Sequence, residues 1–160
     1  MPKAHITPDQ DAVVSEIEIV APPERVFQAL TDEAQLVRWF NDTACPVKVW
    51  KMEPRRGGRY HYATEKSATV VVNGVNEFLC EGEILEFDPP RLLVYTWVGN
   101  WHLDKRLKTT VRWELTPVGG GTHVKVTHSG LATEDVARKD YSGGWLGVLT
   151  NLKSFAEKNA

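Results

Sequence analysis

The hydrophobic pattern of this chain changes its period towards the end, and this change constrains the fold most. From Pro46 onwards, apolar and polar residues alternate in short runs near 46–52, 58–66, 68–72, 76–87, 91–98, 107–116 and 122–129. Turn-forming sequences such as Asn73-Gly74 and Gly119-Gly120-Gly121 separate most of these runs. Short strands separated in this way predict a continuous antiparallel meander.

The last segment has the period of a helix instead. After Tyr141, apolar residues recur mostly three or four positions apart, at Trp145, Val148, Leu149, Leu152, Phe155 and Ala156. Offsets of this kind form one face of an amphipathic helix of about four turns. Thr133-Glu134-Asp135 can start a preceding turn, and Gly143-Gly144 is then either a kink or the true beginning of the long helix.

Two short helices are predicted before the meander. Residues 13–20 alternate as a strand does, and Pro22-Pro23 ends that strand and supplies a preset dihedral for a helix start. Asp32, followed three positions later by Gln35, resembles a capping box and predicts the start of the second short helix.

Charge and composition exclude several classes of protein. The 160 residues carry 19 basic and 21 acidic side chains, for a net charge of -2. The basic pairs Arg55-Arg56 and Lys105-Arg106 are too small for nucleic-acid binding, and no apolar stretch approaches the roughly 18 residues that a membrane span needs. Cys45 and Cys80 fit neither a zinc spacing nor a disulfide framework. We expect a cytoplasmic protein with reduced thiols, no metal, no cofactor, and no nucleic-acid or membrane partner.

These elements together predict an α+β fold. A twisted sheet with one apolar face has to be covered, and only the C-terminal helix is long enough to lie across it. We expect a strongly curved antiparallel sheet of about six or seven strands wrapped around this helix, with the two short helices after the first strand. A single domain is expected over 13–160, after a mobile segment over 1–12. A hollow remains wherever the sheet and the helix do not meet.

Several segments follow a pattern seen in a known family. They are Ala21-Pro22-Pro23-Glu24-Arg25-Val26-Phe27-Gln28-Ala29-Leu30, Arg38-Trp39-Phe40, Gly57-Gly58-Arg59-Tyr60, Gly82–Leu92, Gly121–Gly130, and Gly144-Trp145 with Leu149 and Leu152. These segments, within about residues 13 to 158, resemble the START-like or SRPBCC superfamily, with its birch-pollen-allergen-like helix-grip fold. More narrowly, they resemble the branch named for the activator of heat-shock protein ninety ATPase.

The resemblance implies a helix-grip fold around a cavity for apolar or amphipathic small molecules. Members of the superfamily include carriers, hormone receptors and polyketide cyclases. Because the branch is named for a co-chaperone, the resemblance also raises a chaperone as a partner.

Strand parity predicts which side chains face the helix. Val124, Val126 and His128 share one face, and the two valines mark that face as inward. Strand parity, the apolar face of the C-terminal helix, the second short helix and the loop after residue 98 together give the predicted ligand-binding residues Trp39, Phe40, Tyr60, Tyr62, Tyr95, Trp97, Trp101, Trp113, His128, Trp145, Leu149 and Leu152. Aromatic groups with a polar edge suit a mostly apolar pocket, and they equally suit a solid core. Both interpretations stay open at this point.

His128 is the one weak candidate for a catalytic residue. A half-buried histidine could act as a general base, with Tyr60 or Tyr62 as a second proton carrier. Alternatively, it is a core histidine that is hydrogen-bonded to a backbone carbonyl or to a hydroxyl such as that of Ser129.

Trp101 lies in the loop between two predicted strands. A tryptophan is costly to expose, so it is expected to fold over the cavity mouth or to meet another protein. It could form the entrance together with Trp39 and Phe40, or it could pack locally under the loop.

Three functions are consistent with these observations. The favoured hypothesis is a protein that binds an apolar or aromatic small molecule, without catalysis or with an activity that the sequence does not specify. The second is a cyclase-like or aromatase-like enzyme that uses His128 and a cavity tyrosine. The third is a protein-interaction module or co-chaperone, as a monomer or a homodimer.

Overall fold

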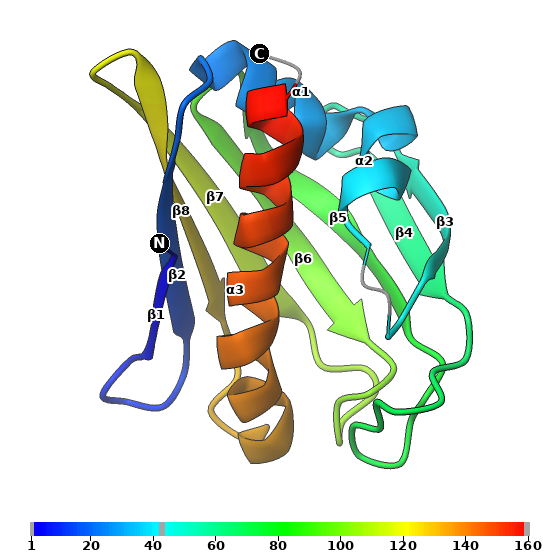
Figure 1. The fold of residues 1–160 in the computed structure, drawn as a ribbon. Helices are drawn as coiled ribbons and strands as arrows, with labels where there is room; N and C mark the ends of the chain where they lie inside the picture. Colours follow the sequence, from blue (N-terminus) through cyan, green and yellow to red (C-terminus); the bar gives the residue numbers. More distant parts are fainter. Residues whose placement is uncertain (1, 42–43, 159–160) are drawn as a thin grey trace.

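One antiparallel sheet and one long helix dominate the part of the chain that the structure describes (Figure 1). The structure is a computed structural model and describes residues 2–41 and 44–158. Its strands are β1 (Lys3–Ile6), β2 (Val13–Ile19), β3 (Val47–Met52), β4 (Arg59–Thr64), β5 (Leu79–Asp88), β6 (Leu92–Gly99), β7 (Thr109–Val118) and β8 (Gly121–Ser129). Its helices are α1 (Pro23–Thr31), α2 (Glu33–Trp39) and α3 (Asp135–Lys158).

The eight strands follow the order β1-β2-β8-β7-β6-β5-β4-β3. The run from β3 to β8 is a meander, and β2 joins it by pairing with the last strand, so that Val13 lies opposite His128. The helix α3 crosses one face of this sheet, and α1 and α2 lie near the C-terminal end of α3 (Figure 1). The α+β class, the antiparallel meander and the three helices are therefore confirmed.

The short helices begin and end where the local sequence predicts. Pro23 stands at the start of α1, where the missing N–H of proline costs no hydrogen bond. The Asp32 carboxylate accepts a hydrogen bond from the Ala34 amide at 3.1 Å and so caps α2. Gln35 reaches back to the same carboxylate at 3.0 Å, which confirms the predicted helix start.

The sheet has more strands than the sequence predicts, because a strand forms within the segment 1–12. Strand β1 pairs antiparallel with β2, with Ala4 opposite Ser15. A tight turn holds the two strands together, in which the Thr7 amide donates to the Ala12 carbonyl at 2.9 Å. A strand of four residues at a sheet edge shows too little alternation to be recognised from the sequence.

One predicted strand is absent from the described residues. The segment 68–72 is irregular and contributes only an isolated bridge between Val72 and Val75. The Ser67 hydroxyl accepts hydrogen bonds from the amides of Thr69 and Val70, at 3.3 and 2.9 Å. This local side-chain bonding bends the backbone away from the sheet ladder.

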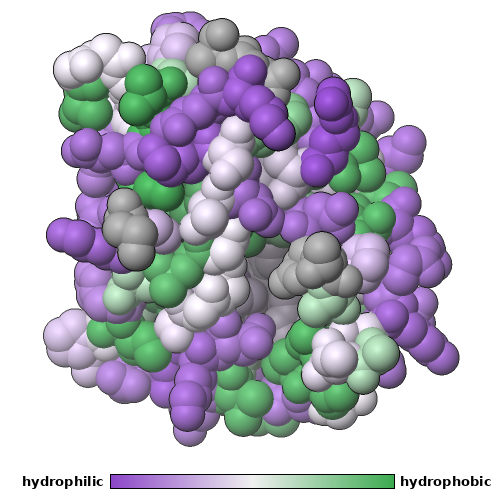
Figure 2. Space-filling model, in the orientation of Figure 1, coloured by the Kyte–Doolittle hydropathy of each residue, from purple (hydrophilic) through white to green (hydrophobic). Residues whose placement is uncertain are grey.

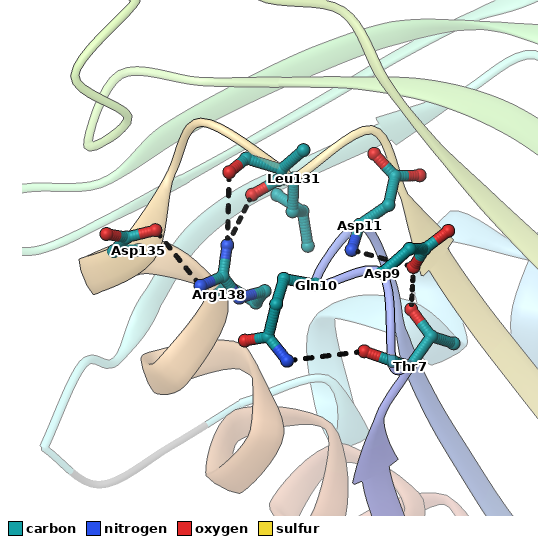
Figure 3. Close-up of polar contacts among 8 residues, drawn as sticks. Thr7, Asp9, Gln10, Asp11, Leu131, Asp135 and Arg138 are labelled. Atoms are coloured by element: carbon teal, nitrogen blue, oxygen red, sulfur yellow. Dashed lines mark hydrogen bonds and ion pairs between the residues drawn. The ribbon is translucent and has the colours of Figure 1, made fainter.

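The helix α3 is longer than predicted and begins at Asp135, before Tyr141 and Gly143. Its first turn is tied to the end of β8 through Arg138, whose guanidinium donates to the Leu131 carbonyl and to the Asp135 carboxylate, both at 3.0 Å (Figure 3). The Leu131 amide donates in turn to the backbone carbonyl of Asp11, at 2.8 Å. Polar contacts therefore start this helix, and an apolar pattern does not reveal them.

The described residues contain no helix of the length and apolar character that a membrane crossing requires.

Gly82 on β5 offers a test of how closely the sheet packs. A Cβ atom at this position would overlap the carbonyl oxygen of Thr96 and lie 2.6 Å from the Tyr60 ring. We expect Gly82→Ala to lower the free energy of unfolding by about 1–3 kcal/mol, as measured by urea denaturation. At Gly147 on α3, a Cβ would meet nothing within 4 Å. Gly147→Ala should therefore raise the unfolding free energy by about 0.5–1 kcal/mol, and equal urea midpoints for the two variants would contradict this difference in packing.

Candidate functional site

A cavity of about 800 Å³ lies between α3 and the part of the sheet formed by β3, β4 and β6. Helix α3 packs most closely against β1 and β2, so that the space on its other side stays open. Figure 2 shows this opening as a hollow in the face that α3 crosses. The walls are formed by Phe40, Asn41, Cys45, Val47, Tyr62, Thr64, Val70, Val72, Phe78, Trp97, Trp101, Asp140, Tyr141, Gly143, Gly144, Trp145, Leu146, Gly147, Val148, Thr150 and Asn151.

Three glycines of α3 belong to this wall: Gly143, Gly144 and Gly147. A Cβ atom at any of them would meet nothing within 4 Å, so packing within the protein does not exclude a side chain there. Glycine inside a helix costs about 0.5–1 kcal/mol relative to alanine, because it loses more backbone freedom on folding. These exposed glycines leave their part of the cavity wall without side chains.

The predicted site residues fall into two groups. Five of the twelve line the cavity: Phe40, Tyr62, Trp97, Trp101 and Trp145. The other seven are buried in the core outside the cavity wall: Trp39, Tyr60, Tyr95, Trp113, His128, Leu149 and Leu152. Parity identifies the inner face of each strand, but it does not show where the helix rests. Trp113, for example, contacts Trp145 of α3 directly, with 5.7 Å between the ring centroids.

Much of the cavity wall lies outside the regular alternation that sequence reasoning uses. Val70, Val72 and Phe78 come from the irregular segment between β4 and β5, and Asn41 follows α2. The glycines of α3 carry the one signal in the sequence that could have located the wall. Several glycines at helical spacing, within an otherwise amphipathic helix, indicate a face that is kept open.

His128 is fully buried and belongs to a chain of hydrogen bonds between α3 and the sheet. The indole N–H of Trp145 donates to His128 Nδ1 at 3.1 Å, so the ring proton is carried by Nε2. That N–H donates to Thr109 Oγ1 at 2.7 Å, and the threonine hydroxyl donates to the Trp97 carbonyl, also at 2.7 Å. Both ring nitrogens are therefore used within the fold.

Burial lowers the pKa of His128 well below its ordinary value, and nearby His102 lowers it further. The ring is therefore neutral at physiological pH, with neither nitrogen free to exchange a proton with a molecule in the cavity. The structure matches the interpretation of His128 as a core histidine, with Thr109 in place of Ser129 as its hydroxyl partner.

A second polar cluster lies where the cavity meets the core. The Tyr141 hydroxyl accepts a hydrogen bond from the Trp97 indole at 2.8 Å and bonds to His102 Nε2 at 2.7 Å. Burial raises the pKa of the Tyr141 phenol well above its ordinary value and lowers that of His102. Both groups are therefore neutral, and they hold the start of α3 against β6 and the loop that follows it.

Tyr62 differs from Tyr141 in a way that matters for binding. Its side chain lines the cavity and is 8% exposed. Within 2–41 and 44–158, its hydroxyl makes no hydrogen bond, whereas the hydroxyls of Tyr60, Tyr95 and Tyr141 all do. Tyr62 therefore offers a polar group to whatever occupies the cavity.

Trp101 folds over the cavity and does not project from its loop. It is 4% exposed, and its ring lies edge-on to Phe78 and Trp97 at centroid distances of 5.4 and 6.2 Å. The Asn73 side-chain amide donates to the Trp101 carbonyl at 2.9 Å and fixes the loop. A ring buried in this way forms a wall of the cavity and is not displayed to a protein partner.

In the part of the chain that the structure describes, no three His, Cys, Asp or Glu side chains come together as metal ligands would. The cavity wall is mostly apolar and aromatic, so its chemistry suits an organic ligand better than an ion.

Residues 20–157 match the model of the family described as Activator of Hsp90 ATPase homolog 1-like protein. The chain belongs to this family, within the START-like or SRPBCC superfamily. The family resemblance that the sequence carries is confirmed. No curated protein matches the sequence.

Solved structures share the fold at low sequence identity. A protein from Rhodobacter sphaeroides is 20% identical with a TM-score of 0.77, and the match covers 96% of each chain. A protein from Chromobacterium violaceum is 22% identical with a TM-score of 0.77, over 92% of this chain and 98% of that one. DynU16, a protein of the dynemicin biosynthetic locus, is 19% identical with a TM-score of 0.71, over 93% of this chain and 48% of that one.

The two cavity-lining tyrosines offer a matched test of the hydrogen bonding. Tyr141→Phe leaves the Trp97 indole and His102 without their shared partner, so the free energy of unfolding should fall by about 1–3 kcal/mol. Tyr62→Phe removes a hydroxyl without a partner and should change it by no more than about 0.5 kcal/mol. Urea denaturation of both variants measures the difference, and equal losses would contradict the assignment.

The neutral state of His128 predicts a pH-dependent stability. Its pKa is lower in the folded protein than the ordinary value of 6.5, so the unfolded chain binds the proton more tightly. The contribution of the neutral ring to the free energy of unfolding is therefore fully present above about pH 6.5. Below that pH it decreases, by up to about 1.4 kcal/mol per pH unit for each such histidine. His128→Gln removes this group, so the free energy of unfolding should depend on pH less steeply, by the uptake of about one proton. Urea denaturation at several pH values measures the slope.

His61 on β4 is exposed and supplies the control for this measurement. His61→Gln makes the same substitution at an exposed position and should keep the slope of the unmodified protein. If His128→Gln also kept the full slope, His128 would not be the buried neutral group that this geometry describes.

Proposed function

We propose that this protein binds an apolar or aromatic small molecule in the cavity between α3 and the sheet, without catalysing a reaction. The size and the lining of the cavity support this proposal. Its volume of about 800 Å³ lies within the range of small-molecule sites. Seven aromatic side chains contribute to its wall: Phe40, Tyr62, Phe78, Trp97, Trp101, Tyr141 and Trp145.

The glycines of α3 are the observation that carries the proposal. Gly143, Gly144 and Gly147 weaken the helix, and the folded chain has room for a side chain at each of them. These exposed positions belong to the cavity wall, and an added side chain there would meet open space. A requirement for open space explains glycine here better than any packing requirement does.

The family adds support for a small-molecule ligand. The relatives of this superfamily fold around internal cavities, and DynU16 belongs to a biosynthetic locus. A cyclase-like activity through His128 has less support, because both of its ring nitrogens are bonded within the fold. A co-chaperone function through Trp101 has less support too, because this ring is buried against Phe78.

Filling the cavity from the helix tests this proposal. The probe is N-phenyl-1-naphthylamine, a neutral aromatic dye whose fluorescence rises in apolar surroundings. Gly144→Leu should raise helix stability while placing an isobutyl group in the cavity. We expect the affinity for the dye to fall about tenfold or more, since the overlap costs about as much as overpacking a core. Fluorescence titration and thermal denaturation measure the two effects separately.

Ser154→Leu is the matched control. Ser154 is exposed on the same helix and does not line the cavity, so the added leucine should leave dye binding unchanged. The proposal fails if the dye does not bind the unmodified protein, or if both leucine variants bind it as well as the unmodified protein does.

A further inference from the structure

We propose that the ligand of this cavity carries a protonated amine, which the carboxylate of Asp140 and the hydroxyl of Tyr62 bind at the cavity mouth. This inference rests on the proposed binding function and adds the charge of the ligand to it. It also gives the ligand an orientation, with the amine outward and the apolar part between α3 and the sheet.

The described residues of the cavity wall carry negative charge and no positive charge. Among the wall residues that the structure describes, Asp140 carries the one charged side chain, and no lysine, arginine or histidine is present. A ligand carboxylate would find no cation in this wall and would lie near a like charge. A cationic group would find an opposite charge at the rim and water beside it.

Asp140 is set apart from the other acidic residues of α3 by its lack of a partner. Asp135 is paired with Arg138 at 3.0 Å, and Glu157 accepts a hydrogen bond from the Val20 amide at 2.8 Å. Within the described ranges, Asp140 takes part in no ion pair and no hydrogen bond with a side chain or an amide outside its helix. Asp140 is an exposed residue of the cavity wall, and desolvation by its surroundings raises the pKa of its carboxyl group, as expected for an acid that lacks a compensating cation.

Tyr62 supplies the second, independent polar group. Its hydroxyl is unpaired in the described chain, although the side chain is 8% exposed and lines the same cavity from β4. Burial is the main cause that raises the pKa of this phenol well above its ordinary value, so the hydroxyl keeps its proton. Asp140 on α3 and Tyr62 on β4 line the same cavity, so one ligand in it has both groups in its wall.

The two groups suit an ammonium better than other polar groups. An ammonium has three N–H donors and no acceptor, so it can donate to the carboxylate and to the phenol oxygen at once. Trp97 and Trp101 also line the cavity, and the face of an indole attracts a cation within about 6 Å of the ring. An aromatic or aliphatic amine therefore satisfies both unpaired groups and keeps its apolar part in the cavity.

The test uses three probes that share one fluorophore and one chain length. Dansylcadaverine ends in an ammonium, its N-acetylated form ends in a neutral amide, and dansyl-aminohexanoate ends in a carboxylate. We expect the unmodified protein to bind the ammonium probe about fivefold more tightly than the neutral one, as for a partly exposed ion pair. The carboxylate probe should bind most weakly. Fluorescence titration at neutral pH and low salt measures all three.

Two variants locate the effect on the proposed groups. Asp140→Asn should bring the ammonium probe to the affinity of the neutral probe, whose own binding should not change. Tyr62→Phe keeps the ring and removes a hydroxyl without a partner, so it should fold normally and weaken the ammonium probe about threefold. Glu24→Gln is the control, because it removes one negative charge from an exposed position in the first turn of α1. It should keep the full preference.

The outcomes separate this inference from the function on which it rests. Equal affinities of the unmodified protein for the ammonium and neutral probes overturn the amine proposal and leave small-molecule binding intact. A preference that Asp140→Asn leaves unchanged also overturns it, since the charge would then act from elsewhere. If neither the three probes nor N-phenyl-1-naphthylamine binds, the cavity is no ligand site and both proposals fail.

Discussion

The position of α3 depends on one chain of buried hydrogen bonds, which runs from the Trp145 indole through His128 and Thr109 to the carbonyl of Trp97. Each of these polar groups is removed from water, so each would destabilise the fold if it lost its partner. The chain can be completed in only one arrangement of helix and sheet. A fixed helix on one side is the condition for an open cavity on the other, because a mobile helix would collapse into the space.

The cavity itself is maintained at a cost in stability. Glycines weaken the middle of α3, Tyr62 keeps a hydroxyl without a partner, and Asp140 holds a charge beside apolar surface. None of these features improves the packing of the empty protein. They become consistent with one another once the cavity is regarded as a site for an amphipathic ligand, which fills the space and pairs the polar groups. The core around Trp97 differs from the cavity, because nearly all of its polar groups are hydrogen-bonded within the fold.

Local chemistry made most of the fold predictable. The capping of α2 by Asp32, the proline start of α1 and the alternation of β7 and β8 are each decided by neighbouring residues, so the sequence alone reveals them. The structure differs from the sequence-based prediction where contacts with other groups override the local hydrophobic pattern. Strand β1 exists because β2 offers it an edge, and Ser67 bends the chain where alternation predicts a strand. The start of α3 follows polar contacts of Arg138 rather than an apolar stripe.

For the site, strand and helix periods alone predict that Tyr62, Trp97 and Trp145 face inward. Which inward residues border open space and which fill a core depends on the folded arrangement of helix and sheet. That distinction depends on where α3 comes to rest on the sheet, and the contacts that set its place join residues far apart in the chain. His128 illustrates the point. Its inward direction follows from strand parity, whereas its bonds to Thr109 and Trp145 exist only once the sheet and the helix meet.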